Sequence, residues 1–197
     1  MSAVGLVILA AGGSSRLGSP KQLLRFDGKS LLRRAAETAV ASVCRPLVVV
    51  LGGSAERCLP ELRDVAISIV QNTAWEEGMG SSIRIGVETL LAQTAEPLDA
   101  LVLMVCDQPL LTSGVIDALV AEYRASRCLI AAAHYGDVAS VPALFHHSLF
   151  PELMGLAGAH GAKQILQRYP EHIHKVAFPD GTLDIDTQAD VARFGLS

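Results

Sequence analysis

The sequence predicts an α/β fold in which a mostly parallel sheet is covered by helices on both faces. Apolar, β-rich runs recur along the first two thirds of the chain, and helical stretches separate them. Parallel strands buried on both faces have this character, and helices connect them in α/β proteins. After Ala133 the segments become shorter and prolines punctuate them, which indicates an appended, partly antiparallel piece that closes over the open sheet.

Two groups of β-rich runs are expected to be strands. The parallel group is Val4–Ala10, Leu47–Leu51, Ala66–Val70, Leu101–Cys106 and Cys128–Ala133. The C-terminal group is Val141–Phe145 and Lys175–Phe178, with Pro142, Pro170 and Pro179 around them.

Between the strands, several stretches are expected to be helices. They are Ser30–Ser42, Ala55–Arg63, Ser81–Gln93, Ser113–Ser126, Gly161–Tyr169 and Thr187–Phe194. Hydroxyl side chains at helix starts favour N-caps, and Ser30, Ser54, Thr112 and Thr187 stand at such positions. Since neither a repeat nor a long linker interrupts this pattern, we expect one domain that covers residues 1–197.

Composition and charge exclude several classes of protein. A chain of 197 residues can bury roughly 70% of its unfolded surface. No apolar run reaches the roughly 18 to 20 residues of a membrane-spanning helix, and the first residues lack the basic region of a signal peptide. We therefore expect a cytoplasmic protein without a membrane partner. A net charge of −4 with interspersed Lys and Arg offers no basic patch, so nucleic acid is not an expected partner either.

The cysteines do not suggest a metal site. Cys44, Cys58, Cys106 and Cys128 are widely spaced, and neither CxxC nor Cys/His clusters occur. Each cysteine lies in or beside an apolar segment. We expect reduced thiols in the core.

The segment LAAGGSSRLGSPKQLL, residues 9–24, follows the first expected strand directly and is the strongest local signal. Its alanines and glycines let successive backbone N–H groups approach phosphate oxygens, and Arg16 and Lys21 add positive charge. The spacing fits neither the dinucleotide motif nor the P-loop. A tight strand-to-helix turn with solvated charges would explain Gly12 and Gly13, but not their combination with Arg16, Pro20 and Lys21.

Two aspartates are candidates for a metal site. Asp107 ends the most apolar strand, and ligands of open α/β sheets bind at the carboxyl ends of the strands. Mg²⁺ binds phosphates through one or two carboxylates while it keeps several waters, so Asp186 brought near Asp107 would complete a sparse site. Alternatively, Asp107 caps a helix or braces a turn, and Asp184 and Asp186 favour the next helix N-terminus electrostatically.

The segment from Gln71 to Arg84 places amide and hydroxyl groups at a strand end, before a helix start with glycines. These groups suit the recognition of a base or ribose, or of an anionic substrate. Alternatively, Ser81 is only an N-cap and Trp75 a core aromatic.

These motifs together resemble the molybdenum cofactor cytidylyltransferase-like group of nucleotidyltransferases along nearly the whole chain. The matching pieces, in order, are LAAGGSSRLGSPKQLL, NTAWEEGMGSSIRIG, CDQPL, VPALF, GAK and DIDT. LAAG resembles the cytidylyl members more than the guanylyl members, which tend to carry LAGG.

The resemblance implies a Rossmann-like nucleotidyltransferase fold of three layers, α/β/α, and transfer of CMP from CTP to a phosphorylated acceptor such as molybdopterin. It also implies Mg²⁺ as cofactor and allows a molybdoenzyme as recipient. The implied catalytic residues are Arg16, Lys21 and Asp107, and the implied metal ligands are Asp107 and Asp186. The implied nucleotide or substrate site consists of Leu9, Ala10, Ala11, Gly12, Gly13, Ser14, Ser15, Arg16, Lys21, Asn72, Ser81, Ser82 and Asp107.

The chain departs from the family pattern at three positions. Ala159 stands where the family often has an acidic residue, Ser140 where a glycine is usual, and Gln188 where a proline is usual. The first two fall in the part expected to face the acceptor, so they bear on which acceptor is used. Rival functions are guanylyl or sugar-1-phosphate transfer on the same loop, and a non-catalytic carrier of a pterin cofactor.

Overall fold

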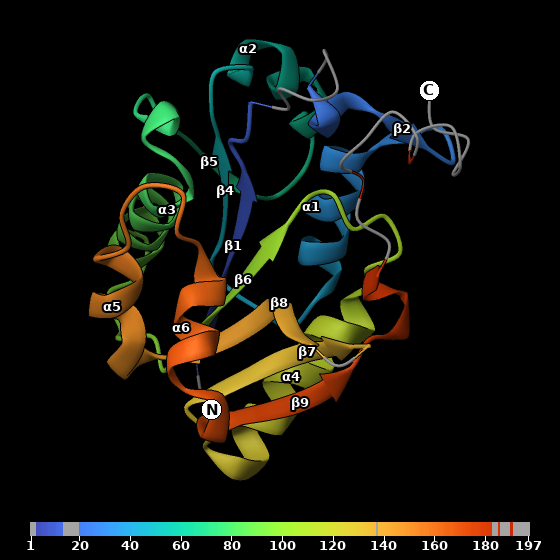
Figure 1. Ribbon diagram of the computed structural model, residues 1–197. Coiled ribbons are helices and arrows are strands. Elements are labelled where there is room, and N and C mark those ends of the chain that lie inside the picture. Colours follow the sequence, from blue (N-terminus) through green and yellow to red (C-terminus); the bar gives the residue numbers. More distant parts are fainter. Residues whose placement is uncertain (1–2, 14–19, 137, 183–184, 186–189, 191–197) are drawn as a thin grey trace.

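A seven-stranded sheet forms the centre of the computed structural model, which describes residues 3–13, 20–136, 138–182, 185 and 190 (Figure 1). The strands follow the order β5, β4, β1, β6, β8, β7, β9 across the sheet. Their bounds are β1 Val4–Ala10, β4 Leu47–Leu51, β5 Ser68–Gln71, β6 Ala100–Val105, β7 Ile130–Tyr135, β8 Val138–His146 and β9 Ile173–Ala177. A separate two-stranded sheet consists of β2 Arg25–Phe26 and β3 Lys29–Ser30.

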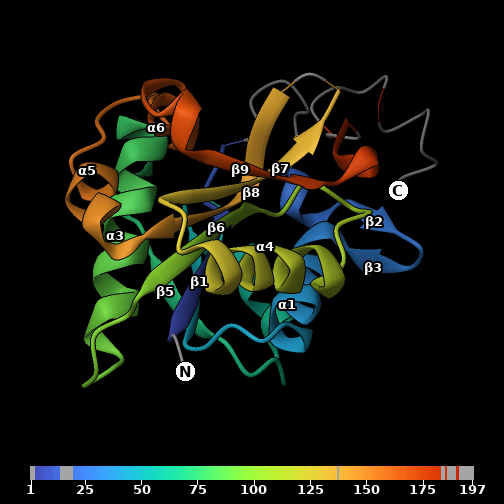
Figure 2. The same ribbon diagram turned by 90° about the horizontal axis from the view of Figure 1, so that it is seen from below.

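Helices cover both faces of the large sheet. They are α1 Leu31–Ala41, α2 Ala55–Cys58, α3 Met79–Ala92, α4 Ser113–Ser126, α5 Phe150–Met154 and α6 Ala162–Arg168. Figures 1 and 2 show α1 and α4 on one side of the sheet and α3 and α5 on the other. The predicted three-layer α/β/α fold is therefore confirmed.

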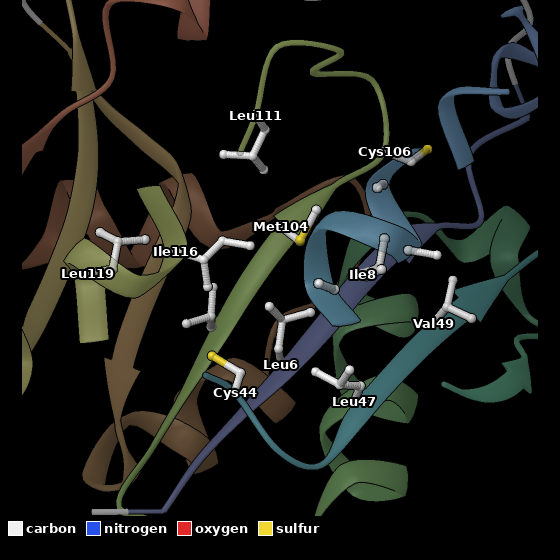
Figure 3. Close-up of a cluster of buried hydrophobic side chains, with 14 of the residues drawn as sticks. Leu6, Ile8, Cys44, Leu47, Val49, Met104, Cys106, Leu111, Ile116 and Leu119 are labelled. Carbon is white, nitrogen blue, oxygen red and sulfur yellow. The ribbon is translucent and has the colours of Figure 1, made fainter. Parts of the chain in front are cut away.

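Side chains that alternate along the central strands fill a separate core on each face. Leu6 and Ile8 of β1 pack with Met104 against α1, α2 and α4, in the cluster that Figure 3 shows. Val7 of β1 and Leu103 of β6 pack on the opposite face against α3, α5 and α6. Because both faces are buried, the strands have no polar positions to alternate with, and this explains their continuous apolar sequences.

The C-terminal addition is antiparallel only at β8, which runs against both of its neighbours, β6 and β7. The outermost strand, β9, pairs with β7 in parallel. Antiparallel character after Ala133 is thus confirmed, but it belongs to one inserted strand.

Pro142 interrupts the ladder inside β8, because proline has no N–H group to donate. The register between β7 and β8 shifts at this point: Ala132 faces Ala143, whereas Ala133 faces Ser140. Val141 and Pro142 are therefore left out of the regular pairing. The Val141 carbonyl instead accepts a hydrogen bond of 3.2 Å from Gln108 Nε2, which comes from the loop after β6.

Several local predictions need correction. The expected helix Ala55–Arg63 is α2 followed by a 3₁₀ turn at Leu59–Leu62, because Pro60 cannot donate the hydrogen bond that would continue an α-helix. Ser30 caps α1 by accepting from the Arg33 N–H, but the side chains of Ser54 and Thr112 make no capping hydrogen bond. The expected helix Thr187–Phe194, with its cap at Thr187, is outside the described residues except for residue 190.

All four cysteines are buried and unpaired in disulfides, as predicted. Burial raises the pKa of Cys44 to about 11 and that of Cys106 to about 12. In the described part of the chain, no helix combines the length and apolar character needed to cross a membrane.

Candidate nucleotide site

A cavity of about 290 Å³ opens at the carboxyl ends of the parallel strands. Three segments that are distant in the sequence line it: the loop after β1, the segment from the 3₁₀ turn Trp75–Glu77 into α3, and the end of β6. The lining residues are Leu9, Ala10, Ala11, Gly12, Gly13, Lys21, Gln22, Trp75, Glu76, Gly78, Met79, Ser82, Val105, Cys106 and Asp107. The cavity thus lies where open α/β sheets bind their ligands.

Lys21 and Asp107 meet in this cavity, although they are 86 positions apart in the chain. Lys21 Nζ forms an ion pair with Asp107 Oδ2, and both side chains are largely buried, with 20% and 13% of their surfaces exposed. Lys21 begins a 3₁₀ turn, Lys21–Leu23, that follows the glycine loop. The predicted approach of the glycine loop and the strand-end aspartate is therefore present in the structure.

The other carboxylate oxygen of Asp107 is suited to a cation. Oδ1 is buried and accepts no hydrogen bond from any described residue. An anionic acceptor without a partner is costly in a buried position, and a divalent cation would satisfy it. Among the described residues, no group of three or more His, Cys, Asp or Glu side chains is arranged so that it could hold a metal ion. A single carboxylate agrees with a sparse Mg²⁺ site, because Mg²⁺ bound to phosphates keeps several waters.

The C-terminal segment returns to this place. The backbone N–H of Ile185 donates to the Asp107 carbonyl at 3.3 Å, and Ile185 is fully buried. The predicted metal ligand Asp186 follows directly in the sequence but lies outside the described residues, as do Ser14, Ser15 and Arg16.

Gln22 stabilises the glycine loop through hydrogen bonds, a role that the sequence alone does not indicate. Its Nε2 donates to the carbonyl oxygens of Ala10 and Gly12, each at 2.8 Å, and the side chain is 1% exposed. Both carbonyls are thereby turned toward Gln22. A Cβ atom at Gly12 would meet no described atom within 4 Å, so Gly12 leaves open space at the cavity wall.

Asn72, Ser81 and Ser82 form one buried polar cluster. Asn72 Nδ2 donates to Ser81 Oγ at 2.8 Å and to Ser82 Oγ at 2.9 Å. The single hydroxyl hydrogen of Ser81 has two carbonyl acceptors within reach, Gly78 at 2.8 Å and Ala74 at 3.0 Å. Of the three predicted residues, Ser82 lines the cavity, whereas Asn72 and Ser81 stand behind it and fix the start of α3. The N-cap of α3 is Gly78 and not Ser81.

The structure describes two of the three departures from the family pattern, Ser140 and Ala159. Ser140 is half-buried in β8, and Ala159 is exposed in the loop before α6. That loop packs on the start of α3, where Gly80 N–H donates to the Gly158 carbonyl at 3.1 Å. Neither Ser140 nor Ala159 lines the cavity, and Gln188 is outside the described residues.

Comparison with known proteins agrees with this geometry. Residues 6–174 match the model of the MobA-like NTP transferase domain. Nicotine blue oxidoreductase of Paenarthrobacter nicotinovorans is 30% identical over 95% of this chain and 94% of its own. Purine catabolism protein PucB of Bacillus subtilis is 28% identical over 82% of this chain and 79% of its own.

Among solved structures, Rv0371c of Mycobacterium tuberculosis in complex with manganese superposes with a TM-score of 0.77 and 26% identity, covering 98% of both chains. The family model covers most of the chain, including the glycine loop and Asp107. This protein therefore belongs to the family of MobA-like NTP transferase domains, and its cavity is that of a nucleotidyltransferase fold.

Proposed function

We propose that this protein transfers CMP from CTP to the phosphate of a molybdopterin-type acceptor, with Mg²⁺ as cofactor and release of pyrophosphate. The observation that carries the proposal is the meeting of Lys21 with Asp107 beside the open wall at Gly12, with Asp107 Oδ1 buried and without a hydrogen-bond donor among the described residues. The cavity thus combines a cation, a carboxylate that can take a metal ion and an exposed loop backbone. These are the groups that nucleotidyl transfer requires.

In this mechanism an oxygen of the acceptor phosphate attacks the α-phosphorus of CTP. The new P–O bond forms as the bond from the α-phosphorus to the oxygen bridging to the β-phosphate breaks, and pyrophosphate leaves with that oxygen. A phosphate monoester has a second pKa near 6, so its oxygen is anionic at neutral pH and no general base is required. Catalysis then rests on positioning and on charge neutralisation.

Each residue has a defined role in the proposal. Lys21 leaves its contact with Asp107 and stabilises the charge that develops at the α-phosphate. Arg16 and the backbone amides of the loop bind the β- and γ-phosphates. Asp107 and Asp186 would hold Mg²⁺, which would supply charge neutralisation at the phosphates. The manganese complex of Rv0371c supports a divalent cation in a related protein.

The preference for CTP and for molybdopterin rests on the resemblance of the loop to cytidylyl members of the family. Leu9, Ala10, Ala11 and Gly12 carry that resemblance, and all four line the cavity. Guanylyl transfer or transfer to a sugar 1-phosphate would use the same loop. A molybdoenzyme that receives the product, and a non-catalytic carrier role, are also compatible with the same cavity.

The likeness to nicotine blue oxidoreductase favours a second candidate, a redox reaction in the same cavity. The loop does not support it, because LAAGGSSRLGSPKQ lacks the spacing of the dinucleotide motif. The buried thiol of Cys106 does not support it either, since burial raises its pKa to about 12 and keeps it protonated.

One activity matrix separates these candidates. CTP, GTP, ATP and UTP are each combined with molybdopterin and with a sugar 1-phosphate, in Mg²⁺ or in EDTA, and pyrophosphate is measured. We expect release with CTP and molybdopterin, abolished by EDTA. Release only with GTP or only with the sugar phosphate would replace the proposed substrates. Conversion of nicotine blue with an added electron donor, and no pyrophosphate in any well, would favour the redox reaction. Magnesium-dependent binding of CTP without turnover would favour a carrier.

A further inference from the structure

Trp75 is the single tryptophan of the chain, and it stands at the wall of the cavity. It begins the 3₁₀ turn Trp75–Glu77 between β5 and α3, and its side chain is half-buried. The position of Trp75 in the sequence does not assign it a function, since an aromatic residue at a strand end is equally suited to the core. The contacts of the indole decide between these roles.

Two glycine turns hold the indole. A Cβ atom at Gly13, after β1, would lie 2.7 Å from Cζ3 of Trp75. A Cβ atom at Gly53, after β4, would lie 2.7 Å from Cε2 of the same ring. Both glycines thus make room for the indole, which packs on the backbone beyond two neighbouring strands. These contacts restrict the position of the indole of Trp75, which is also one of the residues that line the cavity.

The cavity wall changes character from one strand to the next. Asp107 follows β6. Trp75 packs on the turns after β1 and β4, and these two strands follow β6 in the sheet, in the order β6, β1, β4. Met79 lines the cavity near Trp75 in the sequence, is 44% exposed and adds an apolar thioether. Lys21 and Asp107 come from the segments after β1 and β6, whereas the apolar side chains of Trp75 and Met79 come from the segment after β5. A ligand with anionic phosphates and a planar ring would match both.

We propose that Trp75 is a specificity-determining residue that stacks on a planar heteroaromatic ring of the substrate, while Lys21 and the glycine loop bind its phosphates. This inference rests on the proposed function and adds the residue that recognises the ring. Stacking of a base on an aromatic side chain contributes enough to change affinity roughly tenfold. The ring can belong to the nucleotide or to a pterin acceptor, and the experiment distinguishes the two.

The first measurement uses the fluorescence of Trp75 in the whole protein. Mg-CTP is compared with Mg-tripolyphosphate, which carries the phosphates without a ring, and calorimetry measures the binding of each. We expect CTP to quench the fluorescence and tripolyphosphate to bind with little quenching. Equal quenching by both would mean that the loop moves when phosphate binds, and it would overturn stacking. Binding of CTP without quenching would overturn stacking on the base.

The second measurement compares Trp75→Leu with Trp75→Phe, which keeps an aromatic ring. We expect Trp75→Leu to weaken CTP binding roughly tenfold and Trp75→Phe to restore most of it, with tripolyphosphate binding unchanged in both. Gly53→Ala, which crowds the indole from the turn after β4, should resemble Trp75→Leu. An equal loss of tripolyphosphate binding in Trp75→Leu would reduce Trp75 to a support of the loop and overturn the proposal.

The acceptor arm repeats the calorimetry with a pterin. A tenfold loss of pterin binding in Trp75→Leu, with CTP binding unchanged, would support the stacking role and assign the ring to the acceptor. If the wild-type protein binds CTP, but Trp75→Leu changes the affinity for neither CTP nor the pterin, the stacking inference fails and the proposed function stands. If folded wild-type protein binds neither CTP nor tripolyphosphate, the proposed function fails with it.

Discussion

Strands β5, β4, β1 and β6 and strands β8, β7 and β9 belong to one sheet, but they relate differently to the cavity. Every described residue that lines it comes from the segments that follow or end β1, β5 and β6. In the described part of the chain, the second group of strands contributes supporting contacts, such as the hydrogen bond from Gln108 to the Val141 carbonyl. Among the described residues, the parallel half therefore supplies the groups that line the cavity, and the C-terminal half supports the loops that carry them.

The prediction with the largest expected effect concerns the charged residues that the parallel half contributes to the cavity. Asp107→Asn and Lys21→Met should each lower pyrophosphate release roughly 10²–10³-fold, because each removes a preorganised charge from the reacting phosphates. Each variant should still fold, although its unfolding temperature should fall, because one partner of a largely buried ion pair is left without the other. The matched control is Lys175→Met on β9, which removes an exposed lysine of the other half and should leave activity unchanged. Near-normal turnover of Asp107→Asn would remove this carboxylate from the mechanism.

The sequence predicted this part of the molecule well, for a physical reason. β1 and β4 have the predicted bounds because their burial on both faces requires uninterrupted apolar residues. Asp107 could be placed beside the glycine loop because the carboxyl ends of parallel strands share one edge of the sheet, and the family resemblance then implied Lys21 and Asp107 in one site.

The roles of Gln22 and Trp75 could not be predicted in the same way. Gln22 donates hydrogen bonds to carbonyls that lie 10 and 12 positions away in the sequence, and Trp75 packs on glycines of two other turns. Such contacts depend on the final arrangement of the loops. The position of β8 between β6 and β7 was equally hidden, because strand order is not contained in a local apolar pattern.

A second prediction concerns stability at alkaline pH and the two halves of the core. Burial raises the pKa of Cys106 at the end of β6 from 9.0 to about 12. As the pH rises, the Cys106 thiol loses its proton in the unfolded chain before it does so in the folded protein. Its contribution to folding stability is therefore complete below pH 9 and is lost as the pH rises toward 12. The loss should be on the order of 3 kcal/mol by pH 11.

Urea unfolding at pH 8 and at pH 10.5 measures this effect. Cys106→Ala should reduce the slope of stability with pH, and Cys128→Ala, just before β7, should reduce it less, although burial raises the pKa of Cys128 as well. Identical slopes in wild type and Cys106→Ala would show that other groups control alkaline unfolding.

A third prediction tests the support of the glycine loop within the parallel half. Gln22→Ala removes both hydrogen bonds to the carbonyls of Ala10 and Gly12. Unsatisfied buried polar groups cost about 1–3 kcal/mol, so the free energy of unfolding should fall by about 2 kcal/mol. Gln167→Ala, at an exposed position of α6, is the control and should change it by less than about 0.5 kcal/mol. A loss of CTP affinity without loss of stability would mean that Gln22 contacts the ligand directly.

The smallest expected effect lies at the contact that joins the two halves. Gln108→Ala leaves the Val141 carbonyl without its donor, which lowers stability, but it also removes Gln108 Oε1, a buried oxygen that no described residue satisfies. The two changes oppose each other, so the free energy of unfolding should fall by only about 1 kcal/mol. Hydrogen exchange should nevertheless accelerate at the irregular pairing of β7 with β8. If this acceleration leaves pyrophosphate release unchanged, the C-terminal half stabilises the loop after β6 without controlling its chemistry. If pyrophosphate release falls as hydrogen exchange accelerates, the position of Asp107 depends on support from the C-terminal half of the sheet.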